Sequence, residues 1–255
     1  MMGKIIAITN QKGGVGKTTS TINLAAALAE SNQRILVVDF DPQTNATSGF
    51  GVEIGDEDKT IMDALQYPAN TEEYIIPQVL QNLDILAGNI GLSSLEADSY
   101  NEPEGEKKLK KILDTVKDKY DYIIIDCPPS VGMLNINALV ASDSVIIPVQ
   151  CEYFSLEGLS QVMDVISLVR EKMNTSLKIE GILFTMYDGR TKLAQDVVKE
   201  VKNVLHEHIF DTLIPRNVRL AEAPSNGMTI FSYDAASAGA ESYRKLAAEI
   251  LENNM

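Results

Sequence analysis

The fold of this chain is decided by residues 4–19, which read KIIAITNQKGGVGKTT. An apolar run at 4–9 has the composition of a buried strand. A loop rich in glycine follows it directly, and a helical pattern of apolar residues begins after the loop. Strand, glycine-rich loop and helix in this order form the context of a phosphate-binding loop. The sequence therefore predicts an NTPase built on a parallel sheet.

The glycine-rich loop has the residues that phosphate binding requires. Glycines lack side chains, so consecutive backbone N–H groups can converge on phosphate oxygens, and the helix that follows adds its positive N-terminal end. Lys17 can reach the β- and γ-phosphates, and the Thr18 hydroxyl can ligate Mg²⁺. We therefore predict that ATP is bound by Lys12, Gly13, Gly14, Val15, Gly16, Lys17, Thr18 and Thr19.

One position of the loop departs from the usual phosphate-loop pattern. Gln11 stands where a glycine is expected six residues before the lysine, and an additional lysine, Lys12, opens the loop. This is the deviant form of the Walker A motif, which is considerably more specific than the ordinary form.

The rest of the chain alternates between strand-like and helix-like segments. Apolar runs rich in Ile and Val occur at 34–40, 83–87, 120–126, 144–149, 179–185 and 209–214, and amphipathic helical patterns at 156–173, 193–205 and 243–251. Continuous apolar strands are typical of parallel sheets that helices cover on both faces. We predict a doubly wound, mostly parallel α/β fold. No repeat or linker is visible, so we expect a single P-loop ATPase domain over residues 1–255.

Three aspartates stand at the ends of predicted strands. Asp39 and Asp126 end the runs at 34–40 and 120–126, and Asp41 lies just beyond the first of these. Carboxylates at the C-terminal ends of parallel strands project into the crevice that holds ligand. We expect Asp126 to hold Mg²⁺ through a water, as a Walker B carboxylate, and Asp41 to orient the attacking water.

Composition and charge exclude several other classes of protein. Hydrophobic residues make up 45% of the chain, as in ordinary globular proteins, and no apolar run reaches the ~18 residues of a membrane helix. The two cysteines, Cys127 and Cys151, form no disulfide or zinc pattern and are expected to be buried. These features predict a cytoplasmic protein without a membrane partner. The net charge of −14 requires that any DNA binding come from a local basic patch.

Four motifs together resemble a known family. KGGVGKTT, DFDPQTNAT, IIIDCPPS and PRNVRLAEAPSNG occur in the order found in the ParA/Soj partition ATPases of the deviant Walker A superfamily. The resemblance runs from residue 4 to about residue 243. It implies a Mg-dependent ATPase with a slow intrinsic rate that segregates a chromosome or plasmid.

The resemblance also implies roles for individual residues. Lys12 would reach the partner's phosphates in an ATP-bound sandwich homodimer, and Asp41 would be essential for hydrolysis. Asp39 would support the magnesium shell. Adenine would be contacted by Pro215, Arg216 and Asn217, and the segment 148–152 would lie near the nucleotide and the dimer interface.

DNA binding is a further implication of the resemblance. In Soj-like members, surface arginines of the ATP-bound dimer bind double-stranded DNA without sequence specificity. The matching positions are Arg190 and Arg219, and Lys192, Lys199 and Lys202 lie between them on a predicted helix. For the lysines, solvated charges on a helix face are the better explanation. A ParB-type centromere-binding partner would accelerate hydrolysis, and the ATP-bound form would associate with the nucleoid.

Other classes share parts of the pattern. A division-site ATPase of the MinD type has the same nucleotide core, but its basic amphipathic C-terminal helix is not matched by the acidic tail AESYRKLAAEILENNM. An iron–sulfur protein of the nitrogenase type would need cysteines in exposed loops. A scaffold with a decayed nucleotide site is not supported, because the acidic and basic site residues are all retained. The loop begins by residue 11, so we expect no N-terminal helix-turn-helix domain and no sequence-specific repression.

Overall fold

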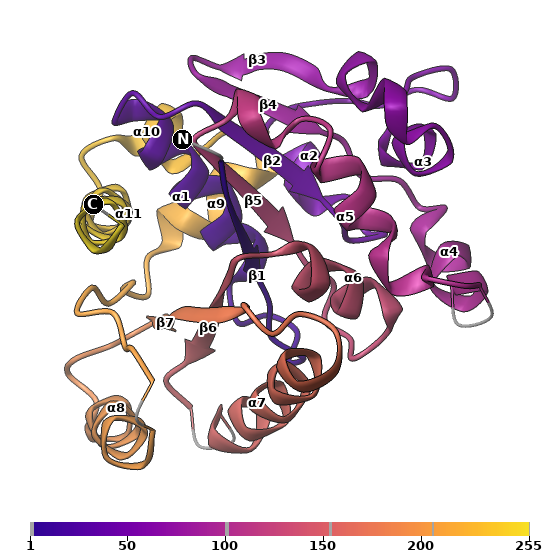
Figure 1. The fold of residues 1–255 in the computed structure, drawn as a ribbon. Coiled ribbons are helices and arrows are strands. Elements are labelled where there is room, and N and C mark those ends of the chain that lie inside the picture. The colour runs from indigo at the N-terminus through magenta and orange to yellow at the C-terminus, as the bar shows by residue number, and fades with distance from the viewer. Residues whose placement is uncertain (1–2, 100–101, 153–154, 206, 255) are drawn as a thin grey trace.

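A seven-stranded sheet forms the centre of the molecule (Figure 1). The structure is a computed structural model that describes residues 3–99, 102–152, 155–205 and 207–254. The strand order is β3-β4-β2-β5-β1-β6-β7. The strands are β1 (Lys4–Ile8), β2 (Ile35–Asp39), β3 (Ile76–Leu80), β4 (Leu83–Leu86), β5 (Tyr122–Asp126), β6 (Ser144–Gln150) and β7 (Lys178–Thr185).

The strand pairs are parallel except at one edge, where β3 runs antiparallel to β4. The chain passes from β1 to β2 on one side and later returns to β6 on the other side of β1. In open α/β sheets such a change of direction creates a crevice at the C-terminal ends of the strands. The glycine-rich loop follows β1 and therefore lies at this crevice.

Helices cover both faces of the sheet. The α-helices are α1 (Lys17–Glu30), α2 (Asn45–Gly49), α3 (Ile61–Gln66), α4 (Leu92–Ser99), α5 (Lys108–Leu113), α6 (Met133–Ala141), α7 (Ser155–Lys172), α8 (Lys192–Val204), α9 (Val218–Ser225), α10 (Ile230–Asp234) and α11 (Ala238–Asn253). Helices α5, α6, α7 and α8 pack on one face, and α1, α9, α10 and α11 on the other.

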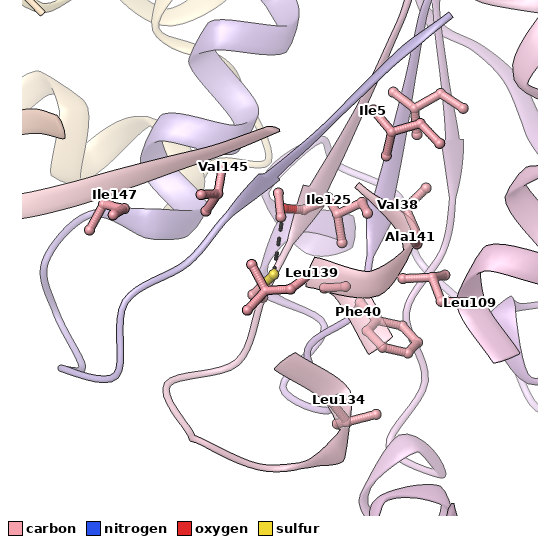
Figure 2. Packing of buried hydrophobic residues seen from close by; sticks show 14 of the residues in the cluster. Ile5, Val38, Phe40, Leu109, Ile125, Leu134, Leu139, Ala141, Val145 and Ile147 are labelled. Atoms are coloured by element: carbon pink, nitrogen blue, oxygen red, sulfur yellow. Dashed lines mark hydrogen bonds between the residues drawn. The ribbon is translucent and has the colours of Figure 1, made fainter. Parts of the chain in front are cut away.

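Alternate residues of each central strand enter two separate hydrophobic clusters. In β1, Ile5 belongs to the cluster under α5 to α8, whereas Ile6 belongs to the cluster under α1 and α11. Figure 2 shows part of the first cluster, to which Ile5, Val38 and Ile125 of neighbouring strands and Leu139 of α6 belong. Burial on both faces explains why the strands are continuously apolar in sequence. The predicted doubly wound, mostly parallel fold is confirmed.

Two details of the strand prediction were wrong. The edge strand β3 was not predicted, because its sequence IPQVL contains a proline and is only partly buried. The segment 209–214 was predicted as a strand but forms an isolated bridge, between Ile209 and Ile182 of β7, and the Ile214 N–H donates separately to the Phe184 carbonyl at 2.9 Å. The backbone N–H groups of Asp211 and Thr212 donate instead to the Glu249 carboxylate, at 2.8 and 3.1 Å. These side-chain bonds take the place of a continuing ladder.

The C-terminal helix is part of this core. Tyr243, Leu246 and Ile250 of α11 are buried in the cluster shared with α1, and the Tyr243 hydroxyl lies 3.1 Å from the Ser20 hydroxyl. Its apolar face is therefore occupied by the protein itself. Across the described parts of the chain, no helix has both the length and the apolar character to cross a bilayer.

Candidate nucleotide and magnesium site

The glycine-rich loop is held between β1 and α1 in a conformation that depends on glycine. Gly14 and Gly16 have φ angles of 73° and 88°, a left-handed region that residues with a side chain rarely adopt. The backbone N–H of Ser20 donates to the Gly16 carbonyl at 2.9 Å, which starts α1 directly after the loop. The first N–H groups of the helix therefore face the space where a phosphate would sit.

Lys17 lies inside the loop. The residue is only 6% exposed, and its ammonium donates to the Lys12 carbonyl at 3.1 Å. Burial lowers the pKa of Lys17, while the charge of Asp126 acts in the opposite direction. A buried ammonium beside anion-binding N–H groups gains a strong partner when phosphate binds.

Two fully buried carboxylates lie side by side at the end of the sheet. Asp39 ends β2, Asp126 ends β5, and the two residues are paired in the parallel register. Asp39 accepts hydrogen bonds from the Thr47 backbone N–H at 2.8 Å and the Thr47 hydroxyl at 2.7 Å. Burial raises the pKa of Asp39 to about 6. Burial, together with the charge of Asp39, raises the pKa of Asp126 to about 8.

This arrangement fits a magnesium ion. Two adjacent buried carboxylates repel one another, and a divalent cation between them would supply the positive charge that offsets this repulsion. The Thr18 hydroxyl lies 2.8 Å from Asp126 Oδ2, so an oxygen-only donor set is already assembled. Within the described residues, no group of three or more His, Cys, Asp or Glu side chains could hold a metal alone. That agrees with Mg²⁺, which binds through one or two carboxylates and completes its shell with phosphate and water.

Asp41 lies two residues beyond the end of β2 in the same crevice. It is 5% exposed, its carboxylate accepts from the Gln43 N–H at 2.9 Å, and its own N–H donates to Asp39 Oδ1 at 3.3 Å. The local turn fixes the direction of the carboxylate. The structure therefore brings Asp41 together with Asp39, Asp126 and Lys17, as expected from the sequence.

A pocket of about 320 Å³ adjoins the glycine-rich loop. Gly16 and Thr19 form one side of it, and the segment Pro215–Asn217 forms another. The pocket is lined mainly by apolar groups, which suits a flat aromatic base. The side-chain oxygen Oδ1 of Asn217 caps α9 by accepting a hydrogen bond from the Arg219 backbone N–H at 2.8 Å. This bond orients the Asn217 side chain. The predicted adenine-contacting residues thus lie beside the loop.

Lys12 is bound within its own chain. Its ammonium lies 3.3 Å from Glu152 Oε2, and the Lys12 and Glu152 side chains are 35% and 47% exposed. The Asn10 side chain receives a hydrogen bond from the Lys12 N–H at 3.0 Å and donates to the Pro148 carbonyl at 2.7 Å. The segment 148–152 therefore lies against the start of the loop.

The predicted DNA-binding residues lie on α8, on α9 and in the loop that precedes α8. The Arg190 side chain is 90% exposed and pairs with Asp188 at 2.7 Å, and Arg219 pairs with Glu222 at 2.9 Å. Backbone hydrogen bonds join Tyr187 to Ile214 and Arg216, which brings the loops that precede these two arginines together. Lys192, Lys199 and Lys202 are exposed on α8.

The two cysteines are buried. Cys127 is fully buried and Cys151 is 7% exposed, and burial raises the pKa of each thiol. A cluster shared between subunits would need exposed thiolates. The expectation of two small buried hydrophobic residues is confirmed.

Three threonines of the site were not predicted from the sequence. Thr21 and Thr47 donate to the two buried aspartates, and Thr185 of β7 donates to the Val15 carbonyl at 2.8 Å. Thr21 could have been found, because it lies one helical turn after Thr18 on the face of α1 that meets the sheet. Nothing in the sequence indicates that Thr185 meets the loop.

Comparison with known proteins agrees with this geometry. Residues 3–179 match the family model described as an AAA domain. The sporulation initiation inhibitor protein Soj of Bacillus subtilis is 53% identical over 252 residues, which span 99% of this chain and 100% of that protein. The chromosome-partitioning ATPase Soj of Treponema pallidum is 51% identical, over 98% of both chains. The chain belongs to the ParA/Soj family of partition ATPases.

Solved structures extend the comparison to ligands. A structure described as cobyrinic acid a,c-diamide synthase of Mycobacterium smegmatis, with bound ADP and magnesium, is 32% identical with a TM-score of 0.86. The match covers 99% of this chain and 95% of that one. The cell division ATPase MinD of Pyrococcus furiosus is 28% identical with a TM-score of 0.78, over 99% and 100% of the two chains. The predicted ATPase class and its nucleotide and magnesium cofactors are thereby confirmed.

Proposed function

We propose that this ParA/Soj-type ATPase is a nucleotide switch that forms an ATP-bound homodimer, holds double-stranded DNA without sequence specificity, and releases it after hydrolysis. The observation that carries the proposal is the convergence of Lys17, Asp41 and the Asp39–Asp126 pair at the end of the sheet beside the glycine-rich loop. In this reading the segregated cargo is a chromosome or a plasmid.

Each group has a task in hydrolysis. The loop N–H groups and Lys17 bind the β- and γ-phosphates, and Thr18, Asp126 and Asp39 hold Mg²⁺, which neutralises phosphate charge when bound. Asp41 accepts a hydrogen bond from the attacking water and orients it toward the γ-phosphate. Such positioning and charge neutralisation are most of what phosphoryl transfer asks of a protein. Pro215, Arg216 and Asn217 hold the base.

Dimerisation depends in this proposal on Lys12. Its position at the start of the loop and its exposed fraction of about one third allow the ammonium to reach a second subunit's phosphates. To do so it must leave Glu152. The Lys12→Ala variant should therefore bind ATP but remain a monomer in Mg-ATP, as measured by light scattering. An ATP-dependent dimer of this variant would remove the role in the partner site.

DNA binding depends on Arg190 and Arg219. Each guanidinium is already paired with a carboxylate, so a single subunit offers DNA little net positive charge. Two subunits would double the number of contacts and place them on one duplex, which raises the effective concentration of the second patch. This accounts for DNA binding that requires the ATP-bound dimer despite a net charge of −14.

The test is retention of duplex DNA with Mg-ATP, Mg-ADP and no nucleotide, over a series of salt concentrations. We expect retention with ATP only, a steep loss with salt, and at least a tenfold loss in Arg219→Ala. Lys245→Ala, on the exposed face of α11, is the matched control. Equal retention of DNA with Mg-ATP, with Mg-ADP and without nucleotide would contradict the proposed switch. A ParB-type protein should accelerate ATP hydrolysis. If it does not, the proposal that such a protein is a partner is wrong.

A further inference from the structure

The Walker B carboxylate is held by two threonines from successive turns of α1. The Thr18 hydroxyl donates to Asp126 Oδ2 and the Thr21 hydroxyl donates to Asp126 Oδ1, both at 2.8 Å. Thr18 and Thr21 are three residues apart, so they share the face of α1 that meets β5. Each carboxylate oxygen thus has its own hydroxyl donor.

The two threonines differ in what they are able to do when magnesium is present. Thr18 is partly exposed to the crevice, and its oxygen is needed as a ligand of the ion. Thr21 is fully buried, so neither the ion nor solvent reaches its hydroxyl. The bond from Thr21 can therefore persist when the bond from Thr18 is lost.

The Thr21 hydroxyl has a second acceptor within reach. The Lys17 carbonyl lies 3.2 Å away, one turn earlier in the helix. A hydroxyl has a single proton, and the shorter contact to a carboxylate is the stronger of the two. Thr21 thereby links the carboxylate to the backbone of the residue that binds phosphate.

We propose that Thr21 is a positioning residue of the magnesium site, which fixes Asp126 through Oδ1 so that Oδ2 faces the ion. This inference rests on the nucleotide and magnesium site proposed above. Partners of this kind orient ligands, and their loss typically lowers metal affinity about 10–100-fold. An alternative role, in which Thr21 only fills space in α1, predicts a change in stability without a change in magnesium dependence.

Thr21→Val tests the proposal because it removes the hydroxyl and keeps the branched shape. Binding of a fluorescent, non-hydrolysable ATP analogue is measured over a magnesium series and in EDTA. We expect the magnesium concentration at half-saturation to rise at least tenfold, while the affinity in EDTA changes less than twofold. Thr21→Ser, which keeps the hydroxyl, should return the magnesium dependence to within about threefold of the parent.

A matched control is Thr71→Val. Thr71 is also fully buried and donates its hydroxyl to a carbonyl, that of Pro68, at 2.7 Å, but it lies outside the site. It should leave the magnesium dependence unchanged. If Thr21→Val does not fold, Thr21→Ala offers a second variant without the hydroxyl, and the same shift is expected.

The outcomes separate this proposal from the one on which it rests. If the parent protein binds the analogue equally well with and without magnesium, the proposed magnesium site is wrong. If the parent requires magnesium and Thr21→Val requires no more of it, Thr21 is not a positioning residue. An equal shift in Thr21→Val, which keeps the methyl group, and in Thr21→Ser, which keeps the hydroxyl, would assign the effect to altered packing at this position and also overturn the inference.

Discussion

Thr185 and Val15 are 170 residues apart in the chain and are joined by a buried hydrogen bond of 2.8 Å. The hydroxyl at the end of β7 donates to a carbonyl inside the glycine-rich loop. The Thr185 side chain also packs beside Gly16, and both residues line the pocket next to the loop. The loop is therefore held from the β7 side of the sheet as well as by β1 and α1.

Thr185→Val tests the importance of this bond. The variant leaves a buried carbonyl without its donor, which costs about 1–3 kcal/mol. We expect nucleotide affinity to fall roughly tenfold, with unchanged dependence on magnesium, because the loop loses preorganisation and the carboxylates do not. The measurement is a nucleotide titration, with Thr185→Ser as the control that keeps the hydroxyl. Affinity equal to the parent in Thr185→Val would show that the bond is dispensable.

Glu152→Gln tests the contact that holds Lys12 within its own chain. An exposed ion pair of this kind contributes about 0.2–1 kcal/mol. Its loss should make Lys12 more available to a partner subunit and strengthen ATP-dependent dimerisation by up to about fivefold. Glu241→Gln removes a similar pair with Lys245 on α11 and is the matched control.

The dimer dissociation constant, obtained by sedimentation in Mg-ATP, decides this prediction. A variant that dimerises tenfold more weakly would show that the Glu152 carboxylate supports the closed dimer and does not restrain Lys12.

Much of the site could be predicted from the sequence, because its main parts are local. Lys17 and Thr18 belong to one loop, and Asp39 and Asp126 each follow an apolar run that ends at the same edge of a parallel sheet. Contacts made by tertiary packing could not be predicted in this way. Thr185 meets Val15 only because β7 and the loop converge at the crevice. The pairing of Arg190 with Asp188 is local, but that of Arg219 with Asp234 depends on how α9 and α10 pack.

The fold, like the site, could be predicted where local sequence patterns decide it and could not be predicted where tertiary contacts do. Central strands are continuously apolar and were recognised, whereas the edge strand β3 is half exposed and was not. The segment 209–214 is apolar enough for a strand, but Glu249 of α11 binds two of its N–H groups. A side chain distant in sequence thus binds N–H groups that the local pattern assigns to a ladder.

Glu180→Gln tests a pH-dependent contact at the end of the sheet opposite the nucleotide site, where the Glu180 carboxylate binds Lys4 and Asn254. Burial acts to raise the pKa of Glu180, but hydrogen bonds from Lys4 and Asn254 outweigh it and hold the pKa below its ordinary value of 4.5. A lowered carboxyl pKa means that the ionised form stabilises the fold. This contribution is complete above pH 4.5 and is lost as the pH falls through the lower, folded-state pKa.

The expected result is a difference between parent and variant that depends on pH. At pH 7, Glu180→Gln should lose about 1–2 kcal/mol, a decrease in melting temperature of roughly 2–8 °C. The difference should shrink as the pH falls below 4.5. Thermal unfolding of both proteins from pH 3 to pH 8 measures it, with the exposed Glu73→Gln as control. A difference that stays constant over this range would contradict the ionic role.

In the proposed cycle, Asp41 orients the attacking water, and the resulting hydrolysis of ATP ends the DNA-bound state. The most direct measurement follows the release of duplex DNA from the parent and from Asp41→Ala after Mg-ATP is replaced by buffer without nucleotide, with phosphate release recorded in parallel. The account predicts that Asp41→Ala binds ATP and DNA, releases phosphate at least 100-fold more slowly, about 2.7 kcal/mol in barrier height, and stays on the DNA correspondingly longer. If Asp41→Ala released phosphate and DNA as fast as the parent, the account would be contradicted.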